Sequence, residues 1–82
     1  MTNEEIIAKT NEALAEEFEL EDHAMTPDAL LYEDLGLDSL DAVDMVVLFE
    51  QRFGIKIGKD PAVVTIKTLG ELHTYVIGKI NG

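Results

Sequence analysis

Cysteine is absent from this 82-residue sequence, and serine occurs once, at position 39. Without cysteine the chain has no disulfide scaffold, no thiolate zinc site and no thiol nucleophile. The sequence contains no apolar run of membrane-spanning length, and its first residues lack both a basic region and a continuous hydrophobic stretch. We therefore expect a cytoplasmic protein that does not insert stably into membranes.

Basic residues are scarce in the first two-thirds of the chain. Up to Gln51, Lys9 stands against fifteen acidic residues, and from Arg52 onward five basic residues stand against two acidic ones, with a net charge of -11 overall. This excess of negative charge disfavours nucleic acid and anionic membrane surfaces as partners. It favours a monomer that meets proteins carrying basic patches.

The length and composition indicate one globular domain over residues 1–82 with a modest core, because 46% of the residues are hydrophobic. The periodicity of these residues predicts an all-α fold, a small four-helix bundle with three principal helices, one short helix and a long first loop. Thr2, Asp38, Asp60 and Thr68 are suitable caps for helices over about residues 3–20, 39–53, 61–65 and 69–80.

The connection over residues 21–38 loses the helical period. Thr26-Pro27-Asp28 is typical of a helix start, so one short turn of helix is expected to continue through Leu30. The apolar side chains of this segment should hold it against the core and leave Glu33 and Asp34 outside; they are Leu30, Leu31, Leu35 and Leu37. We expect a packed loop rather than a flexible linker.

The second principal helix presents two apolar lines. The first, assigned to the core, comprises Ala42, Val46, Phe49 and Phe53. The second, which we call the apolar strip, comprises Leu40, Val43 and Val47 and is bordered by Asp44, Glu50 and Gln51. From the residues alone the strip is either the edge of a wide buried face or an exposed docking surface. Leu48 falls in the polar arc and is expected to be exposed.

The chain carries few groups for catalysis. Ser39 has no histidine near it in sequence; His23 lies in the polar loop and His73 beside apolar positions of the last helix, where we expect it to be packed. Asp38, Asp41 and Asp44 lie along one side of a helix with no turn to enclose a cation. We therefore predict no catalytic residue and no dedicated metal site.

Ser39 itself has two interpretations. An Asp-Ser pair at a helix start is ordinary capping. If Asp38 is the cap, however, Ser39 occupies the first turn, with its hydroxyl toward solvent beside unpaired backbone amides at the positive end of the helix dipole. A phosphodiester formed there would lie in favourable electrostatics.

The residues around Ser39 carry a family likeness. Asp34-Leu35-Gly36-Leu37-Asp38-Ser39-Leu40-Asp41-Ala42-Val43-Asp44-Met45 resembles the phosphopantetheine attachment motif of acyl carrier proteins. The likeness extends upstream through Thr26-Pro27-Asp28 and downstream to Glu50, Phe53-Gly54-Ile55-Lys56-Ile57 and Lys67-Thr68-Leu69-Gly70-Glu71-Leu72. It therefore covers most of the chain in order.

The resemblance implies a carrier rather than an enzyme. A separate phosphopantetheinyl transferase, using coenzyme A and magnesium, would attach 4'-phosphopantetheine covalently to Ser39, with Asp38 and Leu40 as recognition neighbours. The thiol of the arm would hold acyl groups as thioesters for the acyl-transfer and acyl-chain-modifying enzymes of fatty-acid biosynthesis or related lipid metabolism. Residues matching the family's partner face are Asp41, Val43, Asp44, Val47 and Glu50, which favours the docking interpretation of the strip.

The sequence departs from the usual family pattern in two places. Residues 58–64, Gly-Lys-Asp-Pro-Ala-Val-Val, replace the acidic short helix of many carriers, and Gln51-Arg52 interrupts an expected acidic run. We therefore expect a specialised carrier. The alternatives are a carrier for polyketide, peptide or aminoacyl assembly, and an unmodified acidic helical adaptor that docks basic proteins.

Overall fold

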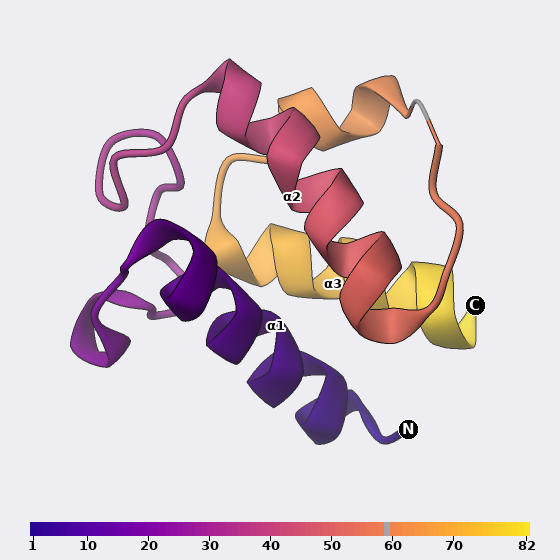
Figure 1. Cartoon of the computed structure of the whole chain (residues 1–82). Coiled ribbons are helices and arrows are strands. Elements are labelled where there is room, and N and C mark those ends of the chain that lie inside the picture. The colour runs from indigo at the N-terminus through magenta and orange to yellow at the C-terminus, as the bar shows by residue number, and fades with distance from the viewer. Residues whose placement is uncertain (59) are drawn as a thin grey trace.

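The computed structural model describes residues 1–58 and 60–82, and its regular elements are all helical (Figure 1). The α-helices are α1 (Asn3–Phe18), α2 (Ser39–Phe53) and α3 (Leu69–Asn81). Two 3-10 helices complete the fold, η1 (Asp22–Ala24) and η2 (Pro61–Thr65). The predicted all-α bundle is confirmed, with the short helix at 61–65 in 3-10 form. Lys59, in the unusual 58–64 segment, lies outside the described residues.

Local capping chemistry sets the ends of α1. The Thr2 hydroxyl accepts a hydrogen bond from the Glu5 amide at 3.2 Å, and the Glu5 carboxylate accepts one from the Thr2 amide at 3.2 Å. This reciprocal capping box is the one expected from the sequence. The helix ends at Phe18, two residues before the predicted end, because Glu19 adopts a left-handed conformation with φ of 55°.

The prediction of a helical turn from Thr26 through Leu30 is wrong. Residues 27–28 form a turn, and the helical turn of this connection comes earlier, at η1. The backbone after residue 28 instead pairs with the approach to α3: the Leu31 amide donates to the Lys67 carbonyl at 2.8 Å and the Leu69 amide to the Ala29 carbonyl at 3.0 Å. Those long-range bonds use groups that a local helix would need.

The long connection nevertheless packs as predicted, with Leu31, Leu35 and Leu37 buried and Leu30 half-buried. Helix α1 packs against both α2 and α3, and η2 packs against α2. The side chains that are almost fully buried come from all three helices and this connection: Ile6, Leu14, Leu31, Met45, Phe49, Leu69, Leu72 and Val76. Each stabilises the fold by roughly 1.5–3 kcal/mol through removal of apolar surface from water.

Helix α2 buries a wider arc than predicted: Ala42 and Phe49 of the expected core line are 1% and 2% exposed, as predicted. Leu48, expected in the polar arc, is only 7% exposed, whereas Val46 and Phe53 of the predicted core line are half-buried. Arg52, one turn after Leu48, faces α1, and its guanidinium lies 2.6 Å from the Glu16 carboxylate of that helix. Helix α1 thus covers the Leu48 side of α2 and leaves Val46 toward η2.

His73 is packed, as predicted, with 6% of its surface exposed. Its Nε2 atom lies 2.7 Å from Oδ1 of Asn11, which joins α3 to α1. Burial lowers the pKa of the His73 imidazole, because the charged form loses hydration that one amide oxygen does not replace. His23, in contrast, is exposed and lies 3.1 Å from the Glu21 carboxylate.

Candidate functional site at the start of helix α2

Ser39 is the first residue of α2 and is exposed. Asp38 is the N-cap, as predicted: its Oδ1 accepts from the Leu40 amide at 2.9 Å and from the Asp41 amide at 3.0 Å. In turn, Oδ2 of Asp41 accepts a hydrogen bond from the Asp38 amide at 3.0 Å. Because the aspartates complete this capping box, the helix does not need the Ser39 hydroxyl as its cap.

The capping bonds change the electrostatics expected at Ser39. The amides of Leu40 and Asp41, which the sequence suggested were unpaired beside Ser39, are both occupied by the Asp38 carboxylate. An anion on the Ser39 oxygen would still meet the positive end of the helix dipole, but it would also have two carboxylates nearby. These two amides are therefore not available to bind an anion at Ser39.

The apolar strip is exposed on α2 directly after Ser39. Leu40 is 75% exposed, Val43 59% and Val47 48%. Val64 of η2 is likewise an exposed hydrophobic residue, with 50% of its surface accessible. The structure thus removes the alternative in which the strip is the edge of a buried face.

The acidic residues bordering the strip differ in their surroundings. Asp44 is exposed and Asp41 half-buried in the capping box. The Glu50 carboxylate folds back onto the loop after α2, where Oε2 accepts from the Ile57 amide at 2.7 Å and from the Gly58 amide at 3.0 Å. These bonds lower the pKa of Glu50, because they stabilise its charged form. Glu50 therefore has a structural function in this loop.

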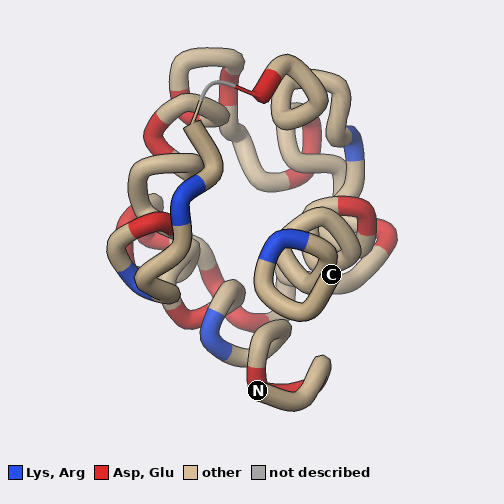
Figure 2. Tube along the Cα trace, turned by 90° about the vertical axis from the view of Figure 1, so that its right-hand side faces the viewer, with Lys and Arg blue, Asp and Glu red and all other residues tan. Residues whose placement is uncertain are grey.

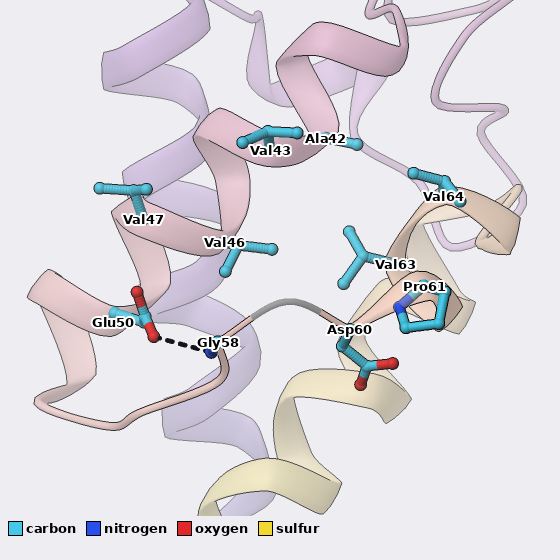
Figure 3. Close-up of a pocket in the computed structure, with 10 residues that line it drawn as sticks. All are labelled: Ala42, Val43, Val46, Val47, Glu50, Gly58, Asp60, Pro61, Val63 and Val64. Carbon is cyan, nitrogen blue, oxygen red and sulfur yellow. Dashed lines mark hydrogen bonds between the residues drawn. The ribbon is translucent and has the colours of Figure 1, made fainter.

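A groove of about 500 Å³ lies between α2 and η2 (Figure 3). Val46 and Val63 point toward each other across it, and Glu50 bonds to Gly58 at the end farther from the start of α2. The lining is mainly aliphatic, with two carboxylates among it, and comprises Ala42, Val43, Val46, Val47, Glu50, Gly58, Asp60, Pro61, Val63 and Val64. Its volume falls in the range of roughly 300–1,000 Å³ typical of small-molecule sites.

The groove and the η2 residues in it were not foreseen from the sequence. The helix-start signal of Asp60-Pro61 located η2, but nothing in the periodicity indicated that Val63 would turn inward and Val64 outward. That division results from packing of η2 against α2, which joins residues about twenty positions apart in the chain.

Acidic positions are spread around the Cα trace, whereas basic ones are few (Figure 2). Within residues 1–58 and 60–82, histidine, aspartate and glutamate nowhere form a group of three or more that could hold a metal ion. In that part of the chain, no helix is long and apolar enough to cross a membrane.

Comparison with known proteins shows the family to which this chain belongs. The family described as "Phosphopantetheine attachment site" matches residues 10–76. The acyl carrier protein of Thermotoga maritima is 37% identical over 79 residues, with 96% of each chain covered. That of Exiguobacterium sibiricum is 37% identical over 76 residues, with 93% of this chain and 95% of the relative covered. The chain belongs to the acyl carrier protein family.

Proposed function

We propose that Ser39 is the attachment point of 4'-phosphopantetheine and that the protein carries acyl groups as thioesters on this arm. The observation that supports the proposal best is the exposed Ser39 at the start of α2, beside a cap that Asp38 and Asp41 complete without its hydroxyl. A modification of that oxygen therefore leaves the helix terminus intact. The terminal thiol of the arm supplies the thioester chemistry.

The serine needs no base from its own chain under this proposal. A separate phosphopantetheinyl transferase, acting with coenzyme A and magnesium, would take the hydroxyl proton. The serine oxygen forms a bond to phosphorus, and the adenosine bisphosphate part of coenzyme A leaves. The surroundings of the two histidines agree with a base supplied by the transferase. His73 is hydrogen-bonded to Asn11, and His23 lies exposed beside Glu21.

Mass spectrometry of the intact protein tests the attachment. Incubation with coenzyme A, magnesium and a broad-specificity phosphopantetheinyl transferase should add one phosphopantetheine to the chain, and S39A should gain nothing. Because Ser39 is the single serine, the assignment does not depend on a choice among serines. An unmodified wild-type chain would refute the proposal, and so would an equal gain in S39A.

The strip and Asp44 form the proposed docking surface for acyl-transfer and acyl-chain-modifying enzymes of fatty-acid or related lipid assembly. Exposed leucine and valine supply apolar contact, and the surrounding negative charge steers basic patches toward it. Weak steered docking of this kind allows a carrier to exchange rapidly among enzymes.

Charge reversal tests the docking surface, and Asp44 is a better position for it than Glu50. Charge reversal at Glu50 also breaks its bonds to the loop amides, so an effect on docking could not be distinguished from an effect on folding. D44K should slow acyl transfer to a partner enzyme at low salt and lose most of that defect at high salt. E12K, on the exposed side of α1, is the charge-matched control and should transfer normally. Equal rates for D44K and E12K would refute this docking surface.

We further propose that the groove between α2 and η2 receives the acyl chain. Its lining on α2 begins at Ala42, about one helical turn after Ser39, and both elements supply aliphatic walls. Transfer of apolar chain from water into such a site is favourable by about 0.8 kcal/mol per buried methylene. A carrier that shelters its cargo in this way protects the chain until a partner enzyme removes it.

A further inference from the structure

The 3-10 helix η2 forms one wall of the groove, yet its own apolar attachment is small. Val63 is buried among its five residues, while Pro61, Ala62, Val64 and Thr65 are exposed. Short 3-10 helices have limited stability of their own. The position of this wall therefore depends on the contacts made at its two ends.

Polar groups from other parts of the fold hold both ends. At the N-terminal end, Asp60 Oδ1 accepts from the Ala62 amide at 3.0 Å, and Oδ2 accepts from the Tyr75 hydroxyl at 2.8 Å. Lys79 Nζ lies 3.3 Å from the same Oδ2 atom. At the C-terminal end, the Tyr32 hydroxyl donates to the Val64 carbonyl at 3.3 Å. Asp60 thus joins the start of η2 to two successive turns of α3.

We propose that the hydrogen bond between Tyr75 and Asp60 is a positioning contact that holds η2 at the separation from α2 required to receive an acyl chain. This inference rests on the proposed carrier function and adds to it the residues that control chain uptake. A wall fixed in advance reduces the ordering cost of binding, because the chain then enters a groove that already has its bound shape.

The chemistry of the three groups keeps this contact in place. Its bonds to the Ala62 amide and the Tyr75 hydroxyl lower the pKa of Asp60, so the carboxylate stays charged at neutral pH. Burial and the neighbouring carboxylate raise the pKa of Tyr75, so its hydroxyl remains a donor. The Lys79 ammonium also lies 5.4 Å from the centre of the Tyr75 ring, where it favours the same ring orientation.

The substitution Y75F removes the hydroxyl and keeps the ring and its contact with Lys79. Wild type, Y75F and the control T74V are loaded with an octanoyl arm by a phosphopantetheinyl transferase from octanoyl-coenzyme A. Thr74 is the adjacent residue on α3, and its exposed hydroxyl donates to the Gly70 carbonyl at 3.1 Å, within the same helix. T74V therefore loses a hydroxyl from α3 without touching η2.

Two quantities are measured for each loaded protein: the rate of thioester hydrolysis in mildly alkaline buffer, and the difference in Tm between octanoyl and unacylated holo forms. Wild type and T74V should show a higher Tm for the octanoyl form and slow hydrolysis. Y75F should lose most of the Tm difference, and its thioester should hydrolyse roughly twofold to tenfold faster than that of wild type. This range is the change in an equilibrium constant that corresponds to the net free energy of one hydrogen bond. Comparing two forms of each variant separates chain uptake from general stability.

The mass of the loaded proteins separates the two proposals. Failure to add an octanoyl arm refutes the attachment of the arm at Ser39. Normal loading with equal hydrolysis and equal Tm differences in Y75F and wild type overturns the positioning inference, as does the same change in T74V. If Y75F does not fold, D60N gives the same test: with the amide oxygen still accepting from the Ala62 amide, an NH2 group replaces Oδ2 and cannot accept from the Tyr75 hydroxyl.

Discussion

The hydrogen bonds and the charge of Asp38 can be separated by two substitutions, which makes this residue the most informative one beside Ser39. In D38A the amides of Leu40 and Asp41 lose the acceptor that now lies 2.9 and 3.0 Å away. Loss of an aspartate cap costs about 1 kcal/mol, and up to about 2 kcal/mol. Each kcal/mol lowers the Tm of a domain of this size by about 4–8 °C.

D38N keeps an oxygen that can accept both bonds, and asparagine equals aspartate as a cap. It loses the attraction of the carboxylate to the helix dipole, about 0.3–1 kcal/mol, and it also removes repulsion from Asp41 and the other acidic groups. These two changes oppose each other and the cap is kept, so we expect D38N to lie within about 0.5 kcal/mol of wild type, as for most substitutions at exposed positions.

Thermal and urea unfolding of the unmodified proteins, followed by circular dichroism, measures the stability of each variant. The rate at which a transferase loads Ser39 is measured in parallel. If the transferase reads the carboxylate, D38N loads slowly with a normal Tm, whereas D38A is impaired in both. E33Q, which removes another exposed charge, controls for net charge. Equal destabilisation by D38N and D38A, or none by either, would refute the assignment of the capping bonds as the stabilising element.

Three further predictions concern stability. L48A should lower the free energy of unfolding by about 2–5 kcal/mol, the usual cost of truncating a buried leucine. L40A, at the exposed strip, should change it by less than about 0.5 kcal/mol. Urea denaturation measures both, and similar losses in the two variants would contradict the observed burial. Burial lowers the pKa of His73 in the folded protein, so the unfolded chain binds the proton more readily. The stability that neutral His73 contributes is complete above the unfolded pKa of about 6.5 and declines as the pH falls below that value. Wild type should therefore lose stability on acidification relative to H73Q, and a difference in stability that does not change with pH would argue against this. Added salt or millimolar divalent cation should raise the Tm by screening the net charge of -11, and an unchanged Tm would mean that the fold already compensates this repulsion.

Local signals were sufficient for much of the fold. Thr2 with Glu5, Asp38 with Asp41, and Gly54 define helix ends through bonds and backbone conformations that involve only neighbouring residues. Such interactions are readable from sequence because both partners lie within one helical turn. The same locality allowed Ser39 to be placed in the first turn of α2.

Signals that depended on distant partners were less reliable. Thr26-Pro27-Asp28 has the composition of a helix start, yet the backbone that follows pairs with residues 67 and 69. Leu48 lies in the polar arc of the isolated helix, yet it is buried in the fold, where α1 packs against α2 and Glu16 pairs with Arg52. Periodicity describes one helix at a time and cannot say on which sides neighbours will pack.

The sequence by itself determined the helical class, the position of Ser39 and the acidic character of the surface, because capping patterns, spacing and composition are properties of the chain. The tertiary structure decided three other things: that Leu40, Val43 and Val47 are exposed, that Glu50 bonds to its own loop, and that α2 and η2 enclose a groove. The bond from Tyr75 to Asp60 belongs to this second group. Each of these features depends on how segments distant in sequence pack together, which local pattern does not specify.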